Sequence, residues 1–408
     1  MFNTVFRKNS LVKKALISLL IVCVFIFGRY IPLPNVPLGA YLADENSALN
    51  LGSSVTGGSL SQIGLFSLGL GPWMYSMILL RLFSLGRPHQ QVSAKRQLIR
   101  QNSIMLIIAV IQALSFAFNL SYTSTTGGLL KAVIETSLIL ITGSYVLLWL
   151  GNQNSVYGLG GPSLIVLANM ILSQKNVFPV AWKLLQNGKN DAFFVIVIIL
   201  WTFVTLFFLV LFEKAEYRVP VKRVSINNSL DEDAYMPIKV NSAGGMPLMY
   251  AYTFLMFPQY LIMLLQYFVP KASNWSKWIS YFTTNSWQGI LIYGMIIFIL
   301  TISFSFVNLD TTTQAENLRN SGDYIDGIRP GKLTKKYLSR IVGYLGTFSG
   351  LYLAAMTCVP LLLALGNKNY QTVAAMTGVF MMISGMLLIV IEEVQTTRLI
   401  RRYKSLFQ

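Results

Sequence analysis

Few residues in this 408-residue chain could do catalytic or metal-binding chemistry. His89 is the only histidine, and it lies in a basic stretch where we do not expect a catalytic dyad. The two cysteines, Cys23 and Cys358, lie in apolar segments, and neither has a neighbour at metal-ligand spacing. We interpret both as buried small apolar side chains. The sequence therefore predicts no catalytic residue, no metal site and no cofactor, so we do not expect an enzyme.

One short stretch resembles part of a nucleotide-binding motif. Residues Gly331–Thr334 (GKLT) look like the end of a phosphate-binding loop. In such a loop a lysine is followed directly by Ser or Thr, and a glycine precedes it at a fixed distance. Neither condition is met here. The chain therefore has no evident energy source, and a partner would have to drive any active transport.

Charged residues in the apolar segments lie near the ends of these segments and not at their centres. Arg29 ends the first segment, Lys131 and Glu135 form an i,i+4 pair, and the acidic pair 392–393 closes the last segment. A charge at the centre of a bilayer costs at least about 2.5–3.5 kcal/mol and commonly marks proton or ion coupling. We interpret these residues as interfacial anchors, and their placement argues against a proton-coupled carrier.

The composition indicates that a bilayer surrounds most of the chain. Hydrophobic residues make up 54% of it and charged residues only 12%, whereas soluble domains carry about 25% charged residues. Apolar segments long enough to cross about 30 Å of hydrocarbon recur throughout, and continuous apolar runs favour helices over barrel strands. We predict an all-α polytopic membrane protein of about ten spans, at residues 15–32, 65–83, 103–122, 129–150, 159–174, 192–213, 246–268, 286–308, 341–364 and 372–391.

The net charge of +17 is distributed unevenly between the two sides of the membrane. Most Lys and Arg residues fall in one set of alternating loops, which the positive-inside rule places in the cytoplasm together with both termini. Anionic lipid explains this basic balance, so we expect no nucleic-acid partner. Two long polar loops on that side, at 214–243 and 309–340, are candidate functional loops. The N-terminal segment lacks a small-x-small cleavage site and is predicted to be the first span.

A faint internal repeat suggests two halves. Pro72–Tyr75 (PWMY) and Pro247–Tyr250 (PLMY) each begin a predicted span, and these two spans cross the membrane in opposite directions. Inverted five-span halves occur in channels and carriers with a central path. The Gly-, Ser- and Asn-rich segment 36–62 could be re-entrant on the outer side. A secondary carrier or flippase for a neutral solute therefore stays open as an alternative. An intramembrane enzyme would need a nucleophile and a base, and none is seen.

Several motifs resemble the SecY family of protein-conducting channels. Met236–Pro247 (MPIKVNSAGGMP) resembles the family pattern Leu-Pro-x-Lys-x-Asn-x-Ala-Gly-x-Ile-Pro. Residues 315–318 (AENL) and 327–334 (GIRPGKLT) resemble the family's eighth loop. Supporting matches, in the family's order and spacing, lie at 29–34, 57–60, 65–72 and 217–220. The resemblance runs from about residue 25 to the C-terminus.

The resemblance implies a clamshell of two inverted five-helix halves, 1–174 and 175–408, with a polypeptide threading its centre. It implies a plug segment at about 50–64 that covers an apolar pore ring. The pore-ring positions are Leu70, Met74, Val166, Met249 and Met382. The plug positions are Ser53, Ser54, Gly57, Gly58 and Leu60. The lateral-gate positions are Pro72, Tyr75, Pro247 and Tyr250.

Departures from the family pattern indicate a specialised member. The ring positions carry Met at three places where the family usually has Ile, which is either neutral drift or an adaptation to unusual cargo. Tyr217 replaces an arginine, the fifth span lacks the family's Gly-Asn-Gly, and the chain is short. In these features it is most similar to SecY of the accessory Sec system of Gram-positive bacteria. That system exports serine-rich glycosylated adhesins with a dedicated SecA-type ATPase. A housekeeping SecY remains an alternative.

The resemblance also implies partners. Arg329 matches an arginine that the family's motor requires, whereas the other basic loop residues fit either motor docking or the positive-inside bias. The predicted docking residues are Arg218, Lys222, Arg223, Arg329, Lys332, Lys335 and Lys336. The implied partners are a SecA-type ATPase, small membrane subunits similar to SecE and SecG, the exported polypeptide and anionic lipid.

Overall fold

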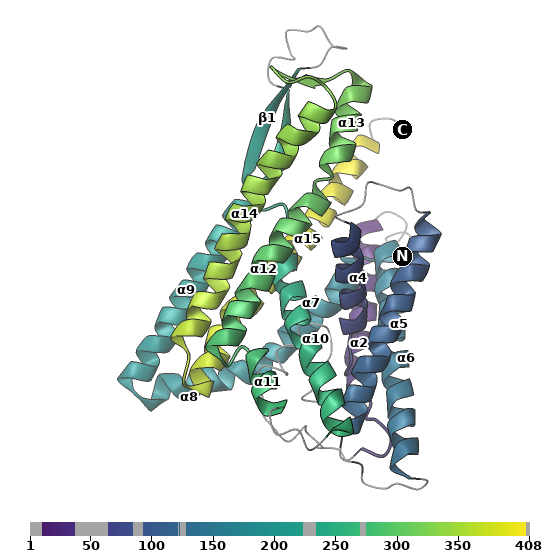
Figure 1. Ribbon diagram of the computed structural model, residues 1–408, viewed down its shortest axis with the longest axis vertical. Helices are drawn as coiled ribbons and strands as arrows, with labels where there is room; N and C mark the ends of the chain where they lie inside the picture. Colours follow the sequence, from purple (N-terminus) through teal and green to yellow (C-terminus); the bar gives the residue numbers. More distant parts are fainter. Residues whose placement is uncertain are drawn as a thin grey trace, which may run out of the picture.

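The computed structural model describes residues 10–36, 64–84, 93–120, 122, 128–222, 234–269 and 275–404, and these residues are mostly helical (Figure 1). The helices are α2 (Ser10–Arg29), α4 (Gly71–Ser84), α5 (Ala94–Phe118), α6 (Leu129–Tyr157), α7 (Gly161–Ser173), α8 (Val177–Asn187), α9 (Lys189–Lys214), α10 (Met246–Phe268), α11 (Trp275–Tyr281), α12 (Trp287–Asn308), α13 (Thr311–Ser321), α14 (Lys332–Leu363) and α15 (Lys368–Lys404), with a 3-10 turn at Gln174–Asn176.

The helices confirm the predicted polytopic membrane fold. Within the described residues, 9 helical segments are long and apolar enough to cross a membrane. The helix α4 has only 14 residues, and the turns at 64–70 that precede it extend the crossing. Counting α4, each predicted span corresponds to one helix.

A small antiparallel sheet lies at one end of the molecule, beside the ends of the long helices (Figure 1). The strands β1 (Glu216–Lys222), β2 (Tyr235–Lys239) and β3 (Tyr324–Ile325) have the order β2-β1-β3. In the register, Val219 pairs with Met236 and Val221 pairs with Ile325. Val219 and Ile325 pack in a second apolar cluster, apart from the membrane core. We call the side of the membrane that carries this sheet the sheet side.

Several helices continue past the bilayer on the sheet side. The helix α14 has 32 residues, or about 48 Å at 1.5 Å per residue, against about 30 Å of hydrocarbon. Because α14 is longer than the hydrocarbon layer is thick, part of it lies outside the membrane. It begins at Lys332, well before the predicted span, which starts at residue 341. Figure 1 shows α13 and the start of α14 beside the sheet. The described parts of the two polar loops predicted from the sequence thus form a sheet, the helix α13 and helix ends.

The start of α10 packs on α15 through two glycines. A Cβ atom at Gly385 would lie 2.6 Å from the Cα of Gly245, whereas a Cβ at Gly378, seven residues earlier on α15, would meet only a Thr357 methyl at 3.9 Å. Backbone cannot yield as a flexible side chain can, so an added methyl at Gly385 forces the two helices apart.

We predict that Gly385→Ala destabilises the protein by about 1–3 kcal/mol through overpacking. The midpoint of thermal unfolding in detergent micelles should fall. Gly378→Ala is the matched control on the same helix and should leave the midpoint nearly unchanged. Equal midpoints for the two variants would contradict the close contact between α10 and α15.

Candidate functional site

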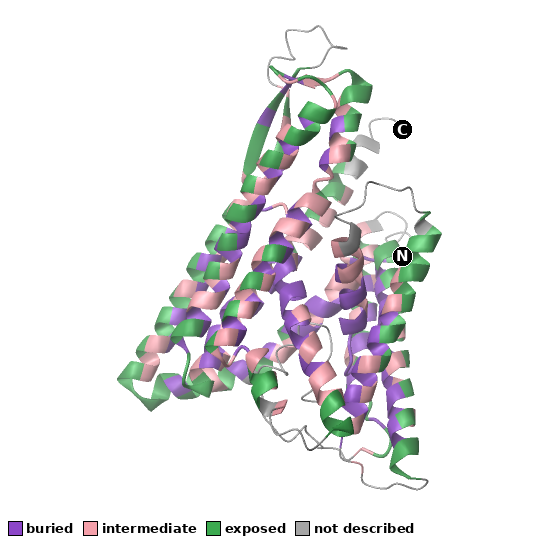
Figure 2. Cartoon of the chain, viewed as in Figure 1, coloured by how far each residue is buried: buried purple, intermediate pink, exposed green. Residues whose placement is uncertain are grey.

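The five predicted ring residues lie in the apolar core of the helix bundle. Figure 2 shows buried residues where α4, α7 and α10 come together, while the outward faces of the helices are exposed. All five are at most 4% exposed and belong to one continuous apolar cluster. They come from the turn before α4, from α4 itself, and from α7, α10 and α15: Leu70, Met74, Val166, Met249 and Met382.

The chemistry of this cluster suits a seal. Thr253 places its hydroxyl 3.8 Å from the Met74 sulfur and donates a hydrogen bond to the Met249 carbonyl at 2.8 Å. The polar group is therefore satisfied inside α10 and leaves the cluster apolar. An apolar constriction resists ions by excluding water. That these five residues form a pore ring stays a prediction.

The helices α4 and α10 meet along a seam held by few polar contacts. The Tyr75 hydroxyl donates to the Thr253 carbonyl, and its ring lies 5.3 Å from that of Phe257. From the other side, the Tyr250 hydroxyl donates to the Met77 sulfur at 3.3 Å. Each tyrosine of the repeated Pro-x-x-Tyr stretch thus reaches across to the opposite helix.

The local sequence explains how these tyrosines are placed. Pro72 and Pro247 each occupy the second residue of their helix, where no intrahelical hydrogen bond requires a backbone N–H. Each proline therefore starts a helix, and the tyrosine follows three residues later, about one turn on. The structure brings Tyr75 and Tyr250 to one seam, while Pro72 and Pro247 begin the two helices; the role of these residues in gating stays a prediction.

The seam continues on both sides of the tyrosines. On α5, the Ser115 hydroxyl donates to the Tyr260 carbonyl at 2.7 Å, and the Phe118 ring stacks on Tyr267 with centroids 4.1 Å apart. Toward the sheet side, the Arg81 guanidinium lies 4.9 Å from the Phe304 ring. Contacts of α4 and α5 with α10 and α12 therefore extend beyond the two tyrosines, and side-chain rotations can break them.

The predicted plug lies outside the described residues. This applies to Ser53, Ser54, Gly57, Gly58 and Leu60. The two chain stretches that flank it are joined: Leu65 donates its N–H to the Ile31 carbonyl at 3.0 Å, and Pro32 forms a bridge with Gly64. Both flanks are thus fixed near the end of α2.

The predicted docking residues gather on the sheet side, around the small sheet and the start of α14. Arg218 lies over the Tyr235 ring at 4.6 Å, and Lys222 forms an ion pair of 3.1 Å with Asp326. Arg329 is exposed in the loop before α14, where its carbonyl accepts a hydrogen bond from Thr334. Arg223 lies outside the described residues.

The lysines at the start of α14 are all exposed: Lys332, Lys335 and Lys336. Lys332 is the first residue of the helix. A helix N-terminus carries a partial positive charge and favours acidic residues, so a lysine there is mildly unfavourable for the helix itself. That these lysines dock a partner stays a prediction.

Three predicted anchors have specific partners instead. Arg29 is buried and donates to Asn169 at 2.7 Å. Glu392 forms an ion pair with Lys239, and Glu393 accepts the Gly160 N–H at 2.7 Å. Each of the three joins its helix to another helix, a strand or a loop, and their interpretation as interfacial anchors stays a prediction. The Lys131–Glu135 pair is found, exposed, at 3.9 Å.

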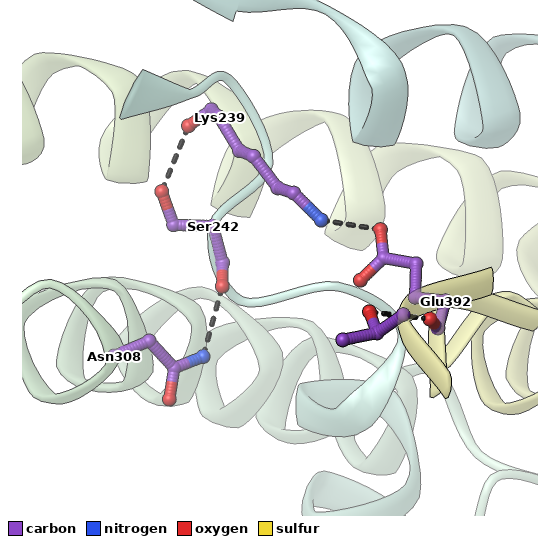
Figure 3. A network of polar contacts seen from close by, with 5 residues as sticks. Lys239, Ser242, Asn308 and Glu392 are labelled. Carbon is purple, nitrogen blue, oxygen red and sulfur yellow. Dashed lines mark hydrogen bonds and ion pairs between the residues drawn. The ribbon is translucent and has the colours of Figure 1, made fainter. Parts of the chain in front are cut away.

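A polar network around residues 239–242 was missed from the sequence (Figure 3). The Ser242 hydroxyl donates to the Lys239 carbonyl, and Asn308 at the end of α12 donates to the Ser242 carbonyl, each at 2.8 Å. Ser349 on α14 donates to the Val240 carbonyl at 2.9 Å. The segment that leads from β2 into α10 is therefore tied to several helices. Its only sequence signal was the motif at 236–247.

The comparisons with known proteins decide the family. The family model named SecY matches residues 64–392. The chain belongs to the SecY family. It is 46% identical over 404 residues, 99% of this chain and 98% of the relative, to the accessory Sec system protein translocase subunit SecY2 of Streptococcus agalactiae serotype Ia. The corresponding subunit of Streptococcus gordonii is 34% identical over 98% of this chain and 99% of its own.

Solved structures agree with the SecY fold. A protein-conducting channel matches with a TM-score of 0.65 at 17% identity, over 93% of this chain and 92% of that one. Sec61 in the canine ribosome-channel complex matches with a TM-score of 0.60 at 16% identity, over 93% and 92%. The ten-helix clamshell predicted from the sequence is therefore confirmed, and the chain is a multi-pass protein of the bacterial membrane.

Proposed function

We propose that this SecY-family chain is the channel subunit of an accessory Sec translocon, which threads polypeptides across the cytoplasmic membrane. The observation that carries the proposal is the seam between α4 and α10, whose closed contacts lie beside a large apolar cluster. A channel for chains of varied sequence needs a seal without fixed polar contacts and a wall that opens. The 46% identity to a SecY2 subunit over 99% of this chain supports the accessory pathway.

The arrangement supports a division of labour along the chain. The halves are 1–174 and 175–408, with the plug at about 50–64 and both termini in the cytoplasm. The basic sheet side, with Arg218, Arg329 and Lys332 exposed, receives a SecA-type ATPase that supplies the energy. Small membrane subunits and anionic lipid complete the assembly, and the chain itself acts without catalysing a reaction.

A carrier for a neutral solute fits the described structure less well. A carrier needs a polar substrate site near the bilayer midplane, whereas the five predicted ring residues are all apolar and belong to one apolar cluster. A carrier also leaves the folded basic sheet and the exposed lysines of α14 without a role.

The proposal is tested in proteoliposomes that hold the chain, its membrane partners and the accessory motor. A serine-rich adhesin precursor should become protected from added protease only with motor and ATP, while an ordinary secretory precursor should not. Protection of the ordinary precursor alone would point to a housekeeping translocon. Protection of neither cargo, with correctly inserted protein, would overturn the proposal.

A further inference from the structure

The two five-helix halves touch along two separate seams. The first half comprises α2, α4, α5, α6 and α7, and the second comprises α9, α10, α12, α14 and α15. One seam joins α10 to α4 and α5, and the other joins α15 to α7. Because α10 also packs on α15, and α6 on both α7 and α4, the helices form a ring in which the two seams lie on opposite sides. If one seam opens as a gate, the other must act as the hinge.

The chain itself supplies one attachment at the hinge. The helix α7 ends at Ser173, and a 3-10 turn and α8 carry the chain directly into α9 of the second half. This covalent crossover lies at the end of α7 that is away from the sheet side. A single attachment lets two bodies swivel in any direction, so it does not define an axis.

The loop at the other end of α7 is held rigidly within the first half. Asn154 is fully buried and donates to the carbonyls of Leu159 and Gly161 at 2.7 and 2.9 Å. Ser18 of α2 donates to the side-chain Oδ1 of Asn154 and accepts the Leu159 N–H at 2.8 Å. Because these hydrogen bonds join α2, α6 and the loop, the loop moves with the first half.

One backbone group of this loop is bound by the second half. The Gly160 N–H donates to Glu393 Oε2 of α15 at 2.7 Å. Gly160 has φ +76, and a Cβ atom there would lie 3.0 Å from a Val390 methyl of the same helix, so only glycine lets α15 approach this closely. A hydrogen bond to a carboxylate is also stronger than one between neutral groups.

We propose that Glu393 is a positioning residue that pins the hinge of this channel at the sheet side. The crossover at 174–188 and the Glu393–Gly160 bond attach the halves at the two ends of α7. These attachments are about 20 Å apart, given 1.5 Å for each of the 13 residues of α7. Two attachments define an axis along α7, about which the halves turn to open the opposite seam.

The Glu393–Gly160 hydrogen bond is linked to α10 through neighbouring residues of α15. Glu392 forms an ion pair with Lys239 at the end of β2, and Gly385 packs on Gly245 at the start of α10. Figure 3 shows Lys239 reaching Glu392 from the segment that leads into α10. A force on the sheet therefore acts on α10 against a helix that Glu393 attaches to the first half.

The test measures distances on both sides of the ring by electron-spin labels in a variant without Cys23 and Cys358. The hinge pair is Val156 on α6 and Gln395 on α15, and the gate pair is Leu98 on α5 and Asn320 on α13, all exposed. During ATP-driven export we expect the gate-pair distance to lengthen while the hinge pair keeps its resting distribution. A hinge pair that shifts as far as the gate pair would overturn the proposal.

The role of Glu393 is tested in the resting state, without motor or cargo. Glu393→Ala should at least double the width of the hinge-pair distribution, whereas Glu393→Gln, which keeps an acceptor oxygen, should retain the narrow one. If the Glu393→Ala variant is present at normal abundance and its hinge-pair distance distribution keeps the same width, the proposed role of Glu393 is overturned. This distance measurement needs no export, so its result remains valid even if the proposed function fails. Failed export in every variant would count only against the proposed function.

Discussion

Arg329→Glu should abolish export while leaving membrane insertion and abundance intact. Arg329 is exposed in the loop before α14, beside the lysines of that helix, and its carbonyl accepts a hydrogen bond from Thr334. Reversing its charge sets like charges against each other at the interface with the proposed motor, at a cost of about 2–3 kcal/mol. The affinity of the motor should fall roughly 30- to 100-fold.

The measurement is motor binding to proteoliposomes, followed by export. Arg319→Glu is the matched control, because Arg319 is also exposed, lies in the same loop region on α13 and carries the same charge. We expect it to bind and export nearly as the unchanged protein does. Normal export by Arg329→Glu, or an equal loss in both variants, would remove Arg329 from the docking surface.

Linking α4 to α10 covalently should stop export. In a background without Cys23 and Cys358, Met77→Cys and Tyr250→Cys place two thiols where the native side chains approach within 3.3 Å. A short, reducible thiol cross-linker should then hold the seam closed, so that export drops more than about tenfold, a barrier increase above about 1.4 kcal/mol. Reduction of the linker should restore it.

A second pair separates gate closure from general stiffening. Thr202 and Thr377 hydroxyls are 2.9 Å apart between α9 and α15, within one half. Linking Thr202→Cys to Thr377→Cys should leave export at the level of the unlinked protein. Export that survives the first link, at confirmed cross-linking yield, would exclude opening between α4 and α10.

The membrane helices were predictable from the sequence because hydrocarbon demands long apolar runs. Each predicted span corresponds to a helix, and α10 matches its prediction at both ends. The errors lie where a helix leaves the bilayer: α14 begins at Lys332 and α15 continues to Lys404. Polar residues end an apolar run but need not end a helix, so hydropathy marks the bilayer boundary and not the helix boundary.

The sheet was not predictable by the same route. The strand β1 is seven residues long and β3 only two, and the pairing of β1 with β3 joins residues about 100 positions apart along the chain. The alternation of buried Val219 and Val221 is a weak signal when Pro220 stands between them. Only the family motif at 236–247 singled out this region.

The candidate site was predicted in part. The repeated Pro-x-x-Tyr stretch led to Tyr75 and Tyr250, which the structure places on one seam. Glu392 and Glu393, in contrast, were interpreted as anchors from their position at the end of a span, because a charge there is favourable at any interface. Their bonds to Lys239 and Gly160 depend on how distant segments pack, which local patterns do not encode.

The central claim, that a polypeptide passes beside α10, is tested most directly by cross-linking. Met249→Cys, in the background without Cys23 and Cys358, is combined with an adhesin precursor that carries one cysteine and is stalled during export. Leu265→Cys on the outward face of α10, 46% exposed in the native structure, is the control. We expect a cross-link at 249 that needs both motor and ATP, and none at 265. No cross-link at 249 in correctly inserted protein, or equal cross-links at both positions, would contradict a polypeptide path through this cluster.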